Sequence, residues 1–156
     1  MTGLMVRTSC APDVPGLASI AMTSRETVQD AQALARTIGA SGATVMQATP
    51  TLWQTLIAEG GEHLPDLKGL AMLTGGEALP GELARSLTAH GRTLTNLYGP
   101  TETTIWSAVM AIGHDELSDD AESPPIGRPI WNTQAYVLSG GLEPVPAGVV
   151  DRKSVV

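Results

Sequence analysis

The chain of 156 residues suits one domain of modest size, and its 42% hydrophobic against 16% charged residues exclude a disordered polypeptide. Nine Lys and Arg against sixteen Asp and Glu give a formal net charge of −7, which disfavours binding to nucleic acids. The single cysteine, Cys10, excludes an internal disulfide, and no apolar stretch is long enough to cross a bilayer. We therefore expect a soluble cytoplasmic protein without nucleic-acid or membrane partners.

The first 23 residues lack a clear hydrophobic period and contain Pro12 and Pro15, so we expect an irregular segment with a short strand near residues 17–22. A helix is predicted from Glu26, because apolar residues follow at spacings of three and four and glycines then end the pattern. These residues are Val28, Ala31, Leu34, Ala35 and Ile38, followed by Gly39 and Gly42. The run at residues 44–47 then predicts a buried strand.

Two more helices and two more strands are predicted in the middle of the chain. Thr49 and Pro50 indicate a helix start, with Thr49 as the N-cap and Pro50 in the first turn. Another helix begins at Pro80, and strand-length apolar runs stand before and after it at residues 70–73 and 93–97. Helices and strands therefore alternate along this part of the chain.

This alternation predicts an α/β fold, a layered subdomain with parallel strands, because helical crossovers join neighbouring parallel strands. After Pro100 the helical pattern ends. Strands are predicted at residues 105–112 and 133–138, with an acidic loop at residues 114–123 between them.

Polar and glycine residues follow three of the predicted strands, at residues 47–50, 74–77 and 96–104. Ligands of parallel sheets bind at the carboxyl ends of strands, so these loops are expected to meet at one crevice if the strands are neighbours. In the last loop, threonine hydroxyls can donate to phosphate oxygens and Glu102 can bind Mg²⁺. Tyr98 offers a flat ring to a purine and Asn96 an amide to its edge. The alternative is a Thr-rich turn with Tyr98 half-buried and no ligand.

The segment from Asn96 to Thr104, NLYGPTETT, resembles the nucleotide-binding loop of nonribosomal peptide synthetase adenylation domains, which belong to the adenylate-forming superfamily. Three further segments resemble that family in the expected order, at residues 44–53, 75–80 and 125–148. The resemblance divides the chain into a divergent segment at residues 1–23, a partial AMP-binding domain at residues 24–150 and a divergent tail at residues 151–156.

The resemblance implies a role in nucleotide binding for five positions. Tyr98 would stack on adenine, and Asn96 would hydrogen-bond the amino edge of the base. Gly75, Gly76 and Glu77 would line the other face of adenine, mainly with their backbone.

The reaction implied by the resemblance is attack of an amino-acid carboxylate on the α-phosphorus of ATP, which gives an aminoacyl-adenylate and pyrophosphate. Thr101 would contact the α-phosphate and Glu102 would hold Mg²⁺, so both are candidate catalytic residues. The implied partners are the amino-acid substrate, the rest of the adenylation domain and a carrier domain in the parent synthetase. Phosphopantetheine would be attached only to that carrier domain, not to this chain.

The resemblance also implies an amino-acid pocket, which is mostly apolar and therefore disfavours a strongly charged substrate side chain. Three of its residues resemble family pockets for cysteine, whereas Gln47 does not, and the amino acid stays open. The positions that match the pocket are Gln47, Met72, Thr74, Leu97, Ile105 and Trp106.

Several family segments are not recognisable in the chain, among them the phosphate loop with its lysine. We therefore expect an internal fragment of a larger ligase that is inactive alone. Two alternatives stay open, an acyl-CoA or aryl-acid ligase of the same superfamily and a non-catalytic remnant.

Overall fold

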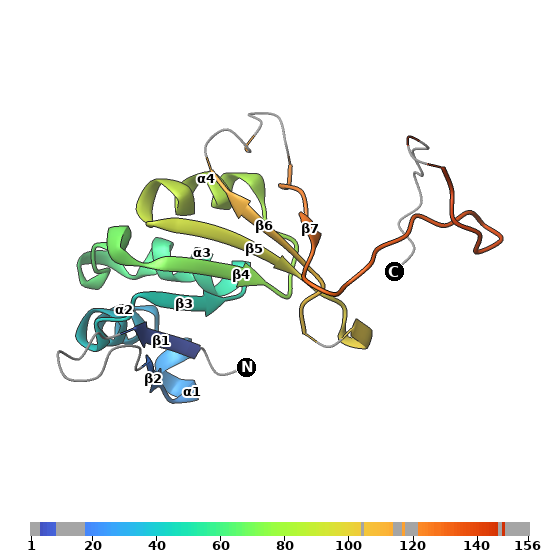
Figure 1. Cartoon of the computed structure of the whole chain (residues 1–156). Coiled ribbons are helices and arrows are strands. Elements are labelled where there is room, and N and C mark those ends of the chain that lie inside the picture. The colour runs from blue at the N-terminus through green and yellow to red at the C-terminus, as the bar shows by residue number, and fades with distance from the viewer. Residues whose placement is uncertain are drawn as a thin grey trace.

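The computed structural model describes residues 4–8, 18–103, 105–113, 117, 122–146 and 148. These residues form a seven-stranded mixed sheet whose strand order is β2-β1-β3-β4-β5-β6-β7 (Figure 1). The strands are β1 (Leu4–Thr8), β2 (Ala18–Met22), β3 (Val45–Ala48), β4 (Ala71–Gly75), β5 (Thr93–Tyr98), β6 (Ala108–Ile112) and β7 (Arg128–Pro129). The helices are α1 (Arg25–Gln29), α2 (Ala31–Ser41), α3 (Pro50–Glu59) and α4 (Gly81–His90).

The centre of the sheet is parallel, as predicted, and both of its sides are antiparallel. Strand β4 pairs in parallel with β3 and with β5, and the connections between these strands contain α3 and α4. Strands β1 and β2 extend the sheet beyond β3, and β6 and β7 extend it beyond β5, all through antiparallel pairs. The predicted α/β class is confirmed, but the sheet is mixed because its outer strands pair antiparallel with their neighbours.

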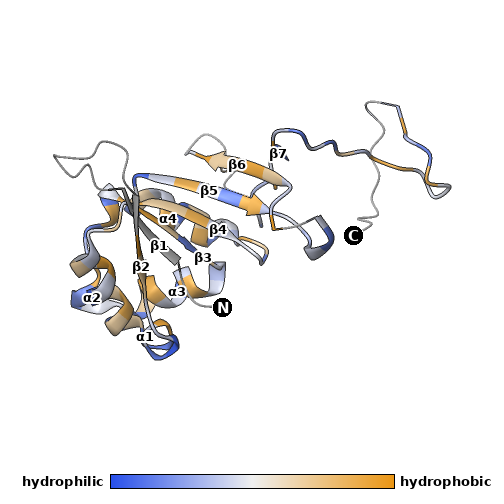
Figure 2. Cartoon of the chain, turned by 60° about the horizontal axis from the view of Figure 1, so that its bottom comes forward, coloured by the Kyte–Doolittle hydropathy of each residue, from blue (hydrophilic) through white to orange (hydrophobic). Residues whose placement is uncertain are grey.

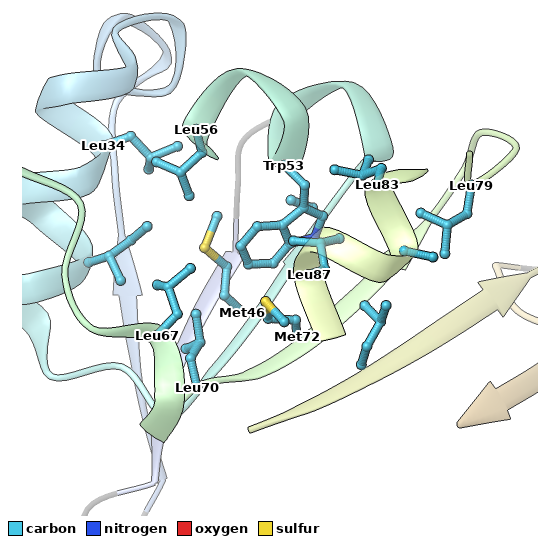
Figure 3. Close-up of a cluster of buried hydrophobic side chains, with 14 of the residues drawn as sticks. Leu34, Met46, Trp53, Leu56, Leu67, Leu70, Met72, Leu79, Leu83 and Leu87 are labelled. Atoms are coloured by element: carbon cyan, nitrogen blue, oxygen red, sulfur yellow. The ribbon is translucent and has the colours of Figure 1, made fainter. Parts of the chain in front are cut away.

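The hydrophobic core lies between the sheet and helices α2, α3 and α4. Side chains alternate between the two faces of a strand, and the buried ones on the central strands all point to the same face. Figure 3 shows Trp53 and Leu56 of α3 and Leu83 and Leu87 of α4 packed against this face. The Trp53 indole is fully buried, and its Nε1 donates to the Leu73 carbonyl oxygen at 3.1 Å. This hydrogen bond ties α3 to the central strand.

The opposite face of the sheet carries no helix among the described residues. On β3 to β6 its side chains are uncharged and are half-buried or exposed rather than buried, and Arg128 of β7 lies opposite Val109 on the same face. We call it the open face; on β3 to β6 it comprises Val45, Gln47, Ala71, Leu73, Thr93, Thr95, Leu97, Val109 and Ala111. After β7 the chain runs away from the sheet, as the two views in Figures 1 and 2 both show.

Helix starts agree with the sequence prediction at α3 and differ at the first helix. The Thr49 hydroxyl accepts from the Leu52 amide at 3.3 Å, with Pro50 at the first position of the helix. The single helix predicted from Glu26 is two helices, because the Asp30 carboxylate caps α2 by accepting from the amides of Gln32 and Ala33 at 3.0 Å. A new N-cap inside the apolar pattern therefore splits the helix.

The predicted strands near both ends of the chain need correction. Strand β1 was not predicted within the irregular segment of residues 1–23, and its pairing with β2 and β3 involves residues distant in sequence. Strand β6 begins at Ala108 rather than at residue 105, because Ile105 has a φ of 72°, outside the range of a strand. Residues 133–138 form no strand; Leu138 makes an isolated bridge with Pro144.

No helix among the described residues is long and apolar enough to cross a membrane.

Candidate functional site

The three loops singled out in the sequence follow neighbouring strands, so they do meet at one edge of the sheet. Thr74 of β4 lies opposite Ala48 of β3 and Asn96 of β5 in the register of the sheet. Because β3, β4 and β5 run in the same direction, their carboxyl ends lie side by side. The expected convergence of the loops is present.

A cavity of about 400 Å³ lies at this edge. Four residues expected to bind the nucleotide line it: Gly76, Glu77, Asn96 and Tyr98. Gly75 and Thr101 are not among its lining residues. The complete lining consists of residues 76–79, residues 96–100, Ser123, Pro124 and Ile126.

Asn96 and Tyr98 lie on the same face of β5, two residues apart. The Asn96 side chain is 5% exposed, and its Nδ2 donates to the Pro125 carbonyl oxygen at 3.3 Å. This hydrogen bond turns the amide so that Oδ1 is the atom that can accept from a ligand. Tyr98 is 38% exposed, so its ring stands at the mouth of the cavity rather than in the core. A flat ring beside an amide acceptor suits a purine with an exocyclic amino group.

The Glu77 carboxylate is bound to the start of α3. Its Oε2 accepts from the Thr51 hydroxyl at 2.5 Å and from the Thr51 backbone amide at 3.1 Å. An anion is favoured there by the free amide groups at the beginning of a helix. The Thr51 hydroxyl in particular holds the pKa of Glu77 below its ordinary value, although partial desolvation acts in the opposite direction. The side chain therefore anchors the loop after β4 and leaves its backbone beside the cavity.

The turn after β5 is held by hydrogen bonds within itself. The Thr103 amide and hydroxyl both donate to the Pro100 carbonyl oxygen at 3.1 Å, and the Ser107 amide donates to the Tyr98 carbonyl oxygen at 2.7 Å. Thr103 also hydrogen-bonds the Ser107 hydroxyl. Residues Thr101–Thr103 form a 3-10 turn, and the side chains of Thr101 and Glu102 are exposed on it. Both are accessible to a ligand that extends from the cavity.

Gly99 allows this turn to close tightly. A Cβ at this position would lie 2.3 Å from the Ile105 carbonyl oxygen and 2.6 Å from the Trp106 Cα. Any larger residue would therefore push the two ends of the turn apart.

A magnesium ion would have one protein carboxylate on this turn, that of Glu102. Among the described residues no group of three or more His, Cys, Asp or Glu side chains could form a protein cage for a metal. Mg²⁺ commonly binds one or two carboxylates together with substrate phosphates and water. The single exposed carboxylate fits that mode of binding and not a site built from protein ligands alone.

The residues expected to form the amino-acid pocket lie on two different faces of the sheet. Gln47 and Leu97 belong to the open face. Met72 and Thr74 point to the opposite face, where both are fully buried. Figure 3 shows Met72 among Met46, Trp53 and Leu87 in the core. The structure therefore does not bring Met72 and Thr74 together with Gln47 and Leu97, because successive side chains of a strand point to opposite faces.

Two residues of β4 share the open face with Gln47 and Leu97. Leu73, which was not among the sequence candidates, lies opposite Gln47, and Gly75, which was expected at the adenine, lies opposite Leu97. The strict alternation of side chains along β4 was the signal that could have identified Leu73. Trp106 packs directly on Gly75, whereas Ile105 is 67% exposed and points to solvent.

The wall formed by Ser123, Pro124 and Ile126 was also missed. The Ser123 hydroxyl donates to the Leu79 carbonyl oxygen at 2.8 Å, and the Gly81 amide donates to the Glu122 carbonyl oxygen at 2.8 Å. These bonds fix the segment beside the loop after β4, about 40 residues earlier in the chain. Of these three residues only Ile126 lies in the segment at 125–148 that resembles the family, and no local pattern indicated where the wall packs.

Comparisons with known proteins agree with this geometry. The model of the AMP-binding enzyme family matches residues 12–150. The dimodular nonribosomal peptide synthase of Bacillus subtilis is 51% identical over 134 residues, which is 85% of this chain and 5% of that protein.

Two solved structures show the same fold. One is a four-domain nonribosomal peptide synthetase bound to AMP and glycine, with 40% identity, a TM-score of 0.69 and coverage of 81% of this chain and 9% of that one. The other is a peptide synthetase protein containing adenylation and PCP domains, with 29% identity, a TM-score of 0.63 and coverage of 74% and 23%. This chain thus spans a small part of the proteins it matches. With the family model covering most of its length, the chain belongs to the AMP-binding enzyme family.

Proposed function

We propose that this chain is the nucleotide-binding part of a domain that activates an amino acid as its adenylate for nonribosomal peptide synthesis. The observation that carries the proposal is the cavity at the ends of β4 and β5, with Asn96 and Tyr98 on one side and the exposed Thr101–Glu102 turn beside it. The similar four-domain synthetase binds AMP and glycine, which supports an amino acid and ATP as the substrates. The cytoplasm and a carrier domain as acceptor are part of the proposal.

In the proposed reaction, a carboxylate oxygen of the amino acid bonds to the α-phosphorus of ATP while the bond to pyrophosphate breaks. Tyr98 and Asn96 hold the adenine, and the backbone of Gly76 and Glu77 lines the other side of the base. The Thr101 hydroxyl donates to an α-phosphate oxygen, and Glu102 holds the magnesium ion. When bound, the ion neutralises charge on the phosphates. Catalysis by these residues rests on positioning and charge stabilisation.

The proposal is tested by placing residues 12–150 into the matching region of the Bacillus subtilis dimodular synthase and measuring ATP–pyrophosphate exchange. We expect exchange that depends on an amino acid and falls by roughly 100-fold or more in Glu102→Ala. The matched control, Glu62→Ala, changes an exposed glutamate outside the site and should retain activity. The chain by itself should show no exchange.

Two results would contradict the proposal. One is a folded hybrid that supports exchange with an aryl or fatty acid but with no amino acid, which would favour the acyl-CoA or aryl-acid ligase alternative. The other is a folded hybrid that shows no ATP–pyrophosphate exchange with any acid tested, which would favour a non-catalytic remnant.

A further inference from the structure

The loop after β4 is attached to the rest of the molecule at two points. At its far end, the Leu79 side chain is 1% exposed, and the Leu79 carbonyl oxygen accepts from the Ser123 hydroxyl at 2.8 Å. At its near end, the Glu77 carboxylate accepts from the hydroxyl and the amide of Thr51. Gly76 has no side chain and a φ of 87°, a conformation that restrains the backbone little. The position of the near end therefore depends on Glu77.

The start of α3 is a firm support for this attachment. Helix α3 is tied to β4 by the bond from Trp53 Nε1 to the Leu73 carbonyl oxygen at 3.1 Å. Thr49 caps the helix, and a Cβ placed on Gly76 would lie 3.9 Å from the Thr49 Cγ2, so the loop passes beside the helix start. Thr51 is in the first turn of this helix and therefore has a fixed position relative to the strand from which the loop emerges.

The Thr51 hydroxyl is the part of this attachment that depends on the residue at position 51. Any residue there except proline supplies a backbone amide, but only threonine or serine supplies a hydroxyl at the same place. The hydroxyl donates to Glu77 Oε2 at 2.5 Å, and it is the main cause of the lowered pKa of Glu77. The carboxylate is therefore ionised at neutral pH, which strengthens the hydrogen bond.

We propose that Thr51 is a positioning residue for the nucleotide, because it holds Glu77 and thereby sets the backbone of Gly76 and Glu77 beside the base. Thr51 is not among the residues that line the cavity, so it acts through Glu77 rather than by contact with ATP. The inference rests on the proposed function and adds to it a residue on a helix outside the site. The base lies away from the reacting phosphorus, so Thr51 should affect the binding of ATP and not the chemical step.

The test uses the hybrid synthase described above, with Thr51→Val and Thr51→Ser, and measures ATP–pyrophosphate exchange at varied ATP and at varied amino acid. In Thr51→Val the KM for ATP should rise about fivefold, while kcat and the KM for the amino acid change less than about twofold. Thr51→Ser keeps the hydroxyl and should retain the KM of the unaltered hybrid. Thr51 is exposed, so neither replacement disturbs the core.

Two further variants separate positioning from a general effect on the helix. Thr55→Val is the matched control, because the Thr55 hydroxyl donates to the Thr51 carbonyl oxygen at 3.0 Å within α3 and the residue is one turn away from the attachment. Its KM for ATP should be unchanged. In a hybrid that carries Glu77→Ala, addition of Thr51→Val should raise the KM for ATP no further, because the two residues act through one interaction.

The outcomes distinguish this inference from the proposed function. Absence of exchange in the unaltered hybrid contradicts the proposed function, and the role of Thr51 falls with it. If the unaltered hybrid exchanges, an unchanged KM for ATP in Thr51→Val overturns the role of Thr51 alone. Equal rises in the KM for both substrates, or additive effects of Thr51→Val and Glu77→Ala, overturn it as well, because they indicate a merely structural effect or two independent ones.

Discussion

Glu77 links two parts of the site that are 26 residues apart in the chain. Its carboxylate accepts from the hydroxyl and the amide of Thr51 at the start of α3, while its backbone stands beside the cavity. A single side chain thereby sets the position of the loop after β4 relative to the helix before it. The interaction is exposed to solvent, so its contribution to stability is modest.

Replacement of Glu77 by Gln should lower the free energy of unfolding of the chain by about 0.5 kcal/mol at neutral pH, because it removes a charge at a helix start. The folded-state pKa of Glu77 is lowered, so the contribution of the carboxylate is present above the unfolded-state value, 4.5, and is lost as the pH falls through the folded-state value. Urea unfolding of the unaltered chain and of Glu77→Gln, at pH 7 and at pH 3, measures the difference between their free energies of unfolding. The control Glu62→Gln should show a smaller effect, and an equal difference at both pH values would contradict the expected linkage.

At the scale of elements, the buried Trp53 holds α3 against the sheet. Its indole is fully buried between α3 and the sheet, and it donates to the carbonyl oxygen of Leu73. Because the aromatic residues of this chain are few, with no phenylalanine, one tryptophan fills a large share of the core. The loss of its ring nitrogen would leave the half-buried Leu73 carbonyl oxygen without that donor.

Trp53→Phe should therefore destabilise the chain by about 1–3 kcal/mol, from a lost hydrogen bond and a small cavity. The midpoint of urea unfolding, followed by circular dichroism, gives this value. Trp131→Phe serves as the control, since that side chain is 98% exposed and should have no measurable effect. Equal stability of the Trp53 and Trp131 variants would mean that α3 is held by other contacts.

The sequence predicted the central elements well because their signals are local. Thr49 and Pro50 mark a helix start within two residues, and the apolar runs of β3, β4 and β5 are continuous. Strand β1 depends instead on pairing with β2 and β3, and the positive φ of Ile105 depends on a turn closed by Tyr98 and Ser107. Such features arise from contacts between distant residues, which no local pattern contains.

In the candidate site, too, residues within recognisable local segments were predicted, and those that depend on distant contacts were not. Gly76, Glu77, Asn96 and Tyr98 of the nucleotide cavity were identified because a recognisable segment carries each of them. The amino-acid pocket stays a prediction: the resemblance supplied positions along the chain, and Met72 and Thr74 lie on the face of β4 opposite to that of Leu73. The wall at Ser123 could not be foreseen, since its hydrogen bond to Leu79 spans 44 residues.

At the scale of the whole molecule, the three long helices that the structure describes cover one face of the sheet, and no described helix covers the other. The open face is apolar in large part, and Val109 on β6 is 38% exposed. Surfaces of this kind are usually covered by another part of a protein or by another copy. The relatives extend far beyond the region that this chain matches.

The isolated chain should therefore self-associate, with a sedimentation coefficient that rises with protein concentration. Val109→Lys should weaken this association, because it places a charge on the open face. The control, Ala89→Lys, alters an exposed position on α4 and should associate as the unaltered chain does. A chain that stays monomeric at all accessible concentrations would show that the open face does not drive association.

The alternation of side chains along β5 has a consequence for engineering. Asn96, Leu97 and Tyr98 all line the proposed nucleotide cavity, and Leu97 also belongs to the open face. A replacement of Leu97 should therefore affect the surfaces on both sides of the strand, whereas Asn96 and Tyr98 belong to the other face alone. Deletion of one residue from this strand would exchange the side chains presented to the two faces.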